Sequence, residues 1–116
     1  EAIAYQVADV IDCMKKESSL PLQELRVDGG CANSDFLMQL QADLLGIRIL
    51  RPETTEATAL GAAFLAGLGV GVWPDREALR SLWKLQSVFT PTLPLAEGAA
   101  MLHRWQQAIA LTLQWT

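Results

Sequence analysis

Apolar and polar positions repeat along the chain with two different periods, which predicts helices separated by short strands. The first helix is expected over residues 2–17, where apolar side chains are spaced by four, three and four positions. These side chains are Ile3, Val7, Val10 and Met14. Ser18, Ser19 and Pro21 should end this helix, because proline and small polar residues disfavour its continuation.

Further helices follow from the same period. Residues 34–45 carry an apolar stripe and stop at Gly46, the residue type most common just after a helix. Residues 97–115 place a second stripe on one face, formed by Leu102, Trp105, Ile109 and Leu113. A short surface helix is expected over residues 75–84, and "FTPTLP" (89–94) is expected to be a linker.

Two short apolar runs predict strands. "LQELRVDGG" (22–30) should be a strand stopped by glycines, and "IRIL" (47–50) a second strand that ends before Pro52. Strands that alternate with helices favour an α/β arrangement. Two short strands do not form a stable sheet alone, so we expect them to belong to a larger sheet and the chain to be a piece of a longer protein.

Residues 57–73, "ATALGAAFLAGLGVGVW", contain no charged side chain. A membrane span is one interpretation, but the run is slightly short of the roughly 18–20 residues that a bilayer helix needs. Gly67, Gly69 and Gly71 would also break a helix near its end. A buried helix, whose small residues allow close packing on a sheet, explains the run better.

Composition and charge narrow the class of protein. The chain has 116 residues, 51% hydrophobic and 19% charged, which is typical of a globular protein. Its net charge is −4, and the only basic pair is Lys15-Lys16, so nucleic acid is not an expected partner. Cys13 and Cys31 are expected to be free thiols in a reducing cytoplasm, and no signal peptide is recognisable.

The candidate ligand site is the glycine pair in "VDGG" (27–30). It follows a predicted strand, and α/β proteins bind ligands at the carboxyl ends of strands. Glycine leaves its backbone accessible, and the N-terminus of the next helix suits a phosphate or another anion. A tight turn that only needs a positive φ explains the same residues, and the stretch is neither GxGxxG nor a Walker loop. Both interpretations remain open on the residues alone.

The remaining polar residues suggest no catalytic or metal-binding set. His103 is the only histidine, the two cysteines lack CxxC spacing, and no serine has a GxSxG context. Glu53 and Glu56 could form a carboxylate pair, but the start of a helix explains their position better. No catalytic residue and no metal ligand is therefore assigned.

Four motifs together resemble the C-terminal domain of the glycerol kinase branch of the FGGY carbohydrate kinase family. They are "VDGG", "DFLMQLQADLLG", "RP" and "TALGAA", and the resemblance runs from about Ile3 to Phe89. The glutamines in the helix after "DGG" are more typical of glycerol kinases than of xylulose or gluconate kinases. The resemblance implies part of an actin-like ATPase (ribonuclease H-like) domain, helix-rich with two or more short strands. Residues 1–116 would be an incomplete C-terminal nucleotide-binding domain.

The resemblance also implies a ligand. In this family ATP binds in a cleft between two domains, and the second glycine of the turn, here Gly30, lies against the nucleotide. An asparagine four residues later commonly assists; here that position holds Ser34, and Asn33 stands one residue earlier. Gly29, Gly30, Asn33 and Ser34 are therefore the expected ATP- or ADP-binding residues.

The implied parent transfers the γ-phosphoryl group of ATP, with Mg²⁺, to a hydroxyl of glycerol or a similar polyol. Its catalytic and polyol-binding residues fall outside this chain, so the chain alone is expected to be inactive. The parent is expected to be a cytoplasmic homo-oligomer, and the rest of its chain is an expected partner. Two alternatives remain: another FGGY kinase, acting on a pentulose or similar sugar, and a non-enzymatic helical interaction domain.

Overall fold

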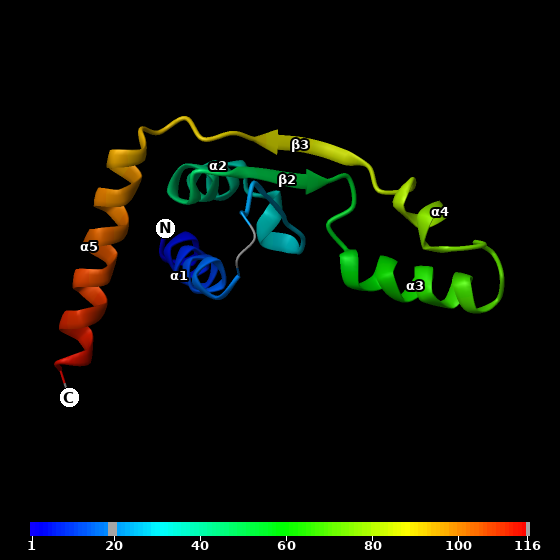
Figure 1. The fold of residues 1–116 in the computed structure, drawn as a ribbon, viewed down its shortest axis with the longest axis horizontal. Helices are drawn as coiled ribbons and strands as arrows, with labels where there is room; N and C mark the ends of the chain where they lie inside the picture. The colour runs from blue at the N-terminus through cyan, green and yellow to red at the C-terminus, as the bar shows by residue number, and fades with distance from the viewer. Residues whose placement is uncertain (19–20, 116) are drawn as a thin grey trace.

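The computed structural model describes residues 1–18 and 21–115, so the predicted helix end at Ser19 lies outside the described residues. The elements, in order, are α1 (Ala2–Glu17), β1 (Glu24–Arg26), the 3₁₀ turn η1 (Gly30–Asn33), α2 (Asp35–Leu45), β2 (Arg48–Pro52), α3 (Ala57–Gly69), α4 (Arg76–Arg80), β3 (Leu85–Phe89) and α5 (Leu95–Leu113). Figure 1 shows α3 and α4 at one end of the molecule, α5 at the other, and the sheet with α1 and α2 between them. The molecule is elongated, with extents of 55 × 34 × 30 Å.

The sheet has the strand order β1-β2-β3, with β2 parallel to β1 and antiparallel to β3. Leu25 of β1 pairs with Ile49 of β2, which in turn pairs with Phe89 of β3. Strand β3 was not predicted, because "LQSVF" (85–89) is mostly exposed and lacks a clear buried face. Strand β2 runs through Pro52 rather than ending before it. The pairing is irregular between Arg51 and Pro52. At such a place the backbone N–H that proline lacks disturbs the hydrogen bonds between the strands least.

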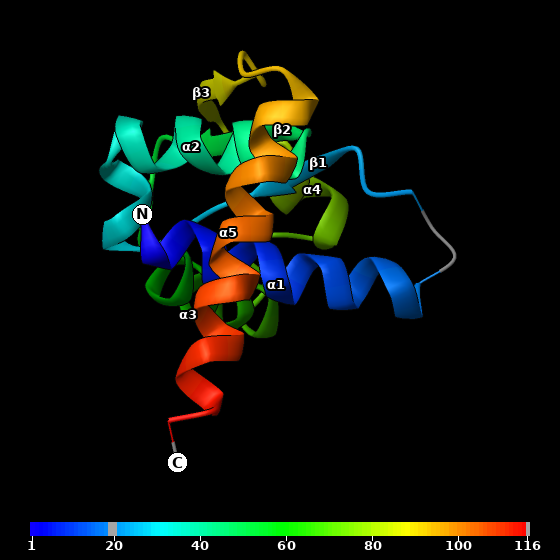
Figure 2. The same cartoon turned by 90° about the vertical axis from the view of Figure 1, so that its left-hand side faces the viewer.

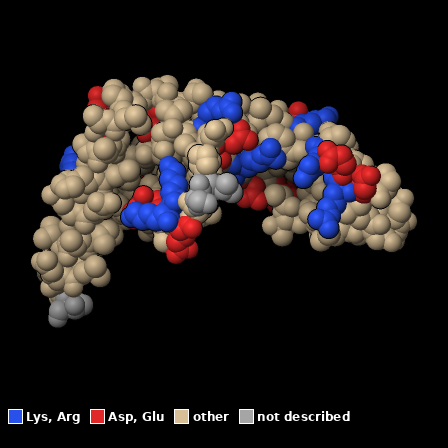
Figure 3. Space-filling model, viewed as in Figure 1, with Lys and Arg blue, Asp and Glu red and all other residues tan. Residues whose placement is uncertain are grey.

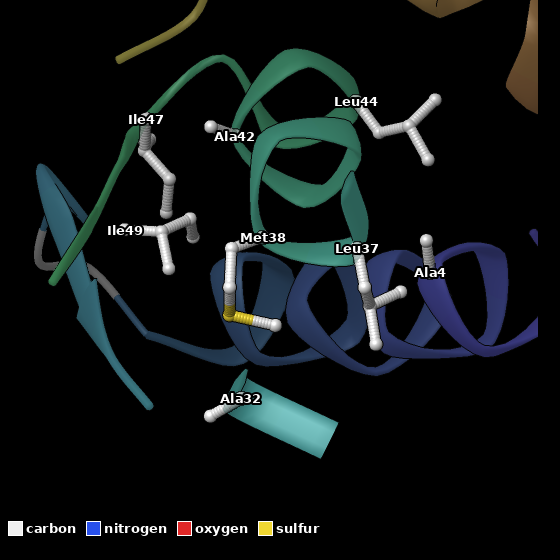
Figure 4. Packing of buried hydrophobic residues seen from close by; sticks show 8 residues of the cluster. All are labelled: Ala4, Ala32, Leu37, Met38, Ala42, Leu44, Ile47 and Ile49. Atoms are coloured by element: carbon white, nitrogen blue, oxygen red, sulfur yellow. The ribbon is translucent and has the colours of Figure 1, made fainter. Parts of the chain in front are cut away.

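The core lies between α2, the sheet, η1 and α1 (Figure 4). Its buried side chains are Ala4, Ala32, Leu37, Met38, Ala42, Leu44, Ile47 and Ile49. In Figure 4, Met38 extends from α2 toward the turn that carries Ala32. Ile49 of β2 is fully buried. The turn after β1 is therefore attached to the core through Ala32, not only through its backbone.

Helix α2 begins and ends as the sequence predicts. The hydroxyl of Ser34, the N-cap, accepts a hydrogen bond from the backbone N–H of Leu37 at 3.3 Å. Gly46 follows the last helical residue with a φ of +64°, the left-handed conformation that favours glycine. Ser34 therefore fixes the junction between η1 and α2, and Gly46 fixes the turn from α2 into β2.

Helix α3 is not buried on the sheet in this chain, and its burial in a longer parent protein stays a prediction. Gly67 is its only buried residue, and Leu65 is 72% exposed. Figure 1 shows α3 beyond the end of the sheet, at one end of the molecule, rather than across a face of the sheet. The helix also continues through Gly67 to Gly69, since one glycine costs only about 1 kcal/mol. Among the described residues, no helix is long and apolar enough to cross a membrane.

Helix α5 crosses α1 and α2 (Figure 2). The ring of Trp105 stacks on Tyr5 of α1 with centroids 5.4 Å apart, and its indole N–H donates to Asp9 at 2.7 Å. Gly98 permits close approach to α2, since a Cβ there would lie 3.1 Å from the carbonyl oxygen of Asp43. The N-terminal half of α5 is thus part of the packed body, whereas Leu111 and Leu113 are largely exposed.

Candidate functional site

The turn between β1 and α2 is held by backbone hydrogen bonds at both of its ends. The N–H of Val27 donates to the carbonyl of Leu50 at 3.1 Å and extends the pairing of β1 with β2. The N–H of Gly29 donates to the carbonyl of Thr55 at 2.8 Å. The N–H of Ala32 then donates back to the carbonyl of Gly29 at 3.0 Å and closes the turn. Gly30 lies between these fixed points.

The two glycines of the turn differ in what the chain requires of them. Gly29 has a φ of +81°, which strains any residue with a Cβ, so the backbone needs glycine there. Gly30 has no positive φ, and a Cβ built on it meets nothing within 4 Å. The turn therefore accounts for Gly29, while the described chain gives no reason for glycine at position 30.

The two candidate polar residues of the site also differ. The Ser34 hydroxyl is engaged as the N-cap of α2, as described above. Asn33 is exposed, and its side-chain amide makes no hydrogen bond to any residue within 1–18 and 21–115. The structure thus brings Gly29, Gly30, Asn33 and Ser34 together on one exposed turn, with Asn33 as the side chain available for a ligand.

Arg51 of β2 contacts this turn. It was not identified as a site residue from the sequence. Its Nη1 donates to the carbonyl of Ala32 at 3.0 Å and to Oδ1 of Asp35 at 2.7 Å. The signal available in the sequence was Arg51 within the apolar run "IRILRP", because a buried charge requires hydrogen-bonding partners. Those partners are set by how η1 and α2 pack against β2, which could not be derived from the sequence.

The pKa of Asp43, which lies on α2 away from the turn, is shifted from its usual value. Partial burial by itself would raise the pKa of this carboxyl. Hydrogen bonds from the backbone N–H groups of Thr92 and Leu93, at 2.6 and 3.1 Å, outweigh burial and hold the pKa below its usual value. Gln39 also donates to the carboxylate, at 3.0 Å. Asp43 therefore attaches the segment before α5 to α2.

The other surface features of the described residues do not compete with the turn as a site. No group of three or more His, Cys, Asp or Glu side chains in this part of the chain could hold a metal ion. A cavity of about 810 Å³ lies between α3, α4 and Arg26, but no residue of the turn lines it. On the face in Figure 3, basic and acidic side chains lie close together, and the C-terminal half of α5 is uncharged. The site is an open surface rather than a closed pocket.

Residues 1–70 match the C-terminal domain of the FGGY family of carbohydrate kinases. The chain therefore belongs to the FGGY family of carbohydrate kinases. Within that family its similarity is to glycerol kinases. It is 50% identical to the glycerol kinase of Dechloromonas aromatica and 48% identical to that of Rhodopirellula baltica, each over 115 residues. These alignments cover 99% of the chain but only 23% and 21% of the relatives, so the chain spans less than a quarter of their length.

Solved structures agree with this assignment. The fold superposes on Plasmodium falciparum glycerol kinase with ADP with a TM-score of 0.82 and 30% identity, over 96% of this chain and 22% of that one. It superposes on the xylulose kinase of Rhodospirillum rubrum with a TM-score of 0.72 and 24% identity, over 97% and 23% respectively. The second match shows the fold alone. The predicted α/β class and the actin-like fold of this kinase family are confirmed.

Proposed function

We propose that this chain, residues 1–116, is the C-terminal nucleotide-binding part of a cytoplasmic glycerol kinase. The full-length protein, called the parent below, would transfer the γ-phosphoryl group of ATP to a hydroxyl of glycerol. Family membership and about 50% identity to glycerol kinases over nearly the whole chain support this function. That the parent is a homo-oligomer stays a prediction.

The observation that carries the proposal is the glycine at position 30. Nothing in the described chain requires it, because its φ is not positive and the space beside it is open. A flat ligand lying against the backbone explains the missing side chain, since a Cβ would take up the ligand's space. The nucleotide is that ligand in the proposal, and Gly29 shapes the turn that presents Gly30.

Asn33 and Ser34 have different roles in this proposal. The amide of Asn33 makes no hydrogen bond within the described residues, and it can both donate to and accept from a ribose or adenine. The hydroxyl of Ser34 already accepts a hydrogen bond from Leu37. We therefore assign the main side-chain contact with the nucleotide to Asn33 and a mainly capping role to Ser34.

The rest of the parent would supply the chemistry that this turn lacks. Phosphoryl transfer depends on positioning and on neutralising the charge of the phosphates. The described residues offer no acidic cluster for Mg²⁺, so the metal ion would be held by the triphosphate and by parts of the parent outside this chain. The polyol site and the catalytic base would lie there too.

Two unpartnered surfaces fit a piece of a larger domain. Strand β1 is an edge of the sheet as described, and α3 exposes apolar side chains on most of its surface. The exposure of α3 also favours a second candidate, a helical interaction domain in which the glycine turn binds nothing. An effect of Gly30 on ATP affinity separates the two candidates.

The test is Gly30→Val in the parent. The KM for ATP should rise at least tenfold, because the new side chain fills the ligand's space, while the KM for glycerol changes much less. Gly69→Val is the control for adding a side chain at a glycine that is far from the turn in sequence, since a Cβ at Gly69 also meets open space in this chain. Its thermal midpoint shows whether the rest of the parent packs against that position. A Gly30→Val protein with the thermal midpoint and the ATP affinity of the parent would exclude nucleotide binding at this turn.

A further inference from the structure

Arg51 is a buried charge whose contacts all lead toward the turn or toward the strand that supports it. Its side chain is only 10% exposed. Nε donates to Oε1 of Gln86 at 3.0 Å, and Nη2 donates to Oγ of Ser87 at 3.3 Å, both on β3. Its Cζ atom lies 5.1 Å from the ring centroid of Phe89. One guanidinium thus joins β2 to β3.

The opposite side of the same guanidinium joins the sheet to the turn. Nη1 donates to the carbonyl of Ala32, inside η1, and to the carboxylate of Asp35, the first residue of α2. Asn33 and Ser34 lie between these two acceptors in sequence. The position of Asn33 relative to the sheet therefore depends on where Arg51 holds the residues on either side of it.

We propose that Arg51 is a positioning residue for nucleotide binding, which sets the geometry of the Gly29–Ser34 turn without touching the nucleotide. This inference rests on the proposed function of the turn. Thr55 fixes the first end of the turn through the N–H of Gly29. Arg51 fixes its second end through Ala32 and Asp35. With both ends held, Gly30 and Asn33 are presented in one arrangement before a ligand arrives, which reduces the cost of binding.

Lysine cannot replace arginine in this role. A guanidinium is a planar fork that donates in several fixed directions at once, whereas an ammonium is a single point charge on a flexible chain. In Arg51→Lys the positive charge stays near Asp35, but the simultaneous contacts with β3 and with Ala32 are lost. Since Ala32 remains anchored in the core by its own side chain, the turn should shift rather than unfold.

The matched control is Arg48→Lys on the same strand. Arg48 pairs with Glu24 of β1 at 3.1 Å, and its side chain is 54% exposed. It makes no contact with η1 or α2 among the hydrogen bonds and ion pairs of the described residues. The same substitution three residues away thus alters only an exposed ion pair, whose positive charge is kept, and makes no direct change to the contacts of the turn.

The experiment measures the KM values for ATP and glycerol, the Kd for ADP and the thermal midpoint in the parent. Arg51→Lys should weaken ATP and ADP binding about tenfold, the size expected for losing charge-assisted hydrogen bonds. The KM for glycerol should stay within about twofold, and Arg48→Lys should leave both KM values unchanged. Added to Gly30→Val, Arg51→Lys should weaken ATP binding little further, because residues that act through one element are not additive.

If Arg51 contributes only to the stability of the fold, the same measurements should give different results. A lower thermal midpoint with unchanged ATP and ADP affinity would overturn the inference, as would an equal rise in both KM values. If Gly30→Val weakens ATP binding and Arg51→Lys does not, the positioning role is wrong while the proposed function stands. If neither substitution changes ATP binding, both fail.

Asp35→Ala keeps the inference testable if Arg51→Lys does not fold. It removes one acceptor of Arg51 from an exposed position and should weaken ADP binding about threefold. Losing a negative charge beside a polyanion would by itself strengthen binding, so weaker binding points to the lost Arg51 contact. Unchanged or tighter ADP binding by Asp35→Ala would refute the positioning role.

Discussion

Oδ1 of Asp43 accepts a hydrogen bond from the backbone N–H of Thr92 at 2.6 Å, which ties α2 to the segment that leads into α5. The same oxygen accepts from the N–H of Leu93 at 3.1 Å. Gln39, one turn earlier on α2, donates to the carbonyl of Thr90 at 2.8 Å. The linker predicted at "FTPTLP" is thus a fixed connection, because its backbone groups are paired with side chains of α2.

Asp43→Asn should loosen this connection in a pH-dependent way. The pKa of Asp43 is lowered in the folded state, so its stabilisation is complete above the unfolded value of about 4 and is lost as pH falls through the lower folded pKa. At pH 7 the substitution should cost about 1–2 kcal/mol of local stability. Hydrogen exchange at the amides of Thr92 and Leu93 measures this directly.

The difference in exchange protection between Asp43→Asn and the unsubstituted protein should stay constant from pH 7 to about 5 and narrow below about 4. Thr92→Ala is a useful comparison, because it removes a hydroxyl that also donates to Asp43 but keeps the backbone N–H. A difference that widens toward low pH would contradict the role assigned to the Asp43 carboxylate.

The isolated chain should have no kinase activity. It spans less than a quarter of the glycerol kinases that it resembles, and its described residues include no metal-binding acidic cluster. Incubation with ATP, Mg²⁺ and glycerol should release no more ADP than a blank without protein. Turnover at an ordinary enzymatic rate of about 1 per second or more would show that the chain carries a complete active site.

Asn33→Ala and Ser34→Ala should act on different properties of the parent. Asn33→Ala should weaken ADP binding by up to about tenfold, the value of one hydrogen bond to the ligand. Ser34→Ala should instead lower stability by about 1 kcal/mol through loss of the N-cap, with little effect on ADP affinity. Titration calorimetry with ADP, combined with thermal melts, separates the two effects. The reverse pattern would assign the nucleotide contact to Ser34.

Ala62→Leu should test whether the parent covers α3. Ala62 is exposed in the chain as described, so its enlargement should leave the isolated chain's thermal midpoint unchanged. In the parent, close packing against α3 would make the larger side chain cost about 1–3 kcal/mol. An unchanged midpoint in the parent as well would mean that α3 stays uncovered there.

Local chemistry alone determined much of this protein. The period of the apolar residues predicted helices at α1, α2 and α5. In α1, however, the predicted stripe is not the buried face, because Ile3, Val10 and Met14 are each more than half exposed. The buried residues of α1 are Ala4, Ala8 and Ile11. Gly46 marked the end of α2 because glycine enters the left-handed conformation without strain. Gly29 of "DGG" marked the candidate turn for the same reason, because its φ is +81°.

Only the tertiary structure decided how distant residues meet. Strand β3 exists because β2 pairs with it, and a mostly exposed five-residue run carries no local signal of that partner. The exposure of α3 depends on the extent of the sheet beside it, which no period within the helix encodes. Arg51 reaches Ala32, Asp35, Gln86 and Ser87 across gaps of 16 to 36 residues in sequence. Spatial contacts of this kind follow from the packing of the whole chain, so the sequence identified the turn but not the residue that holds it in place.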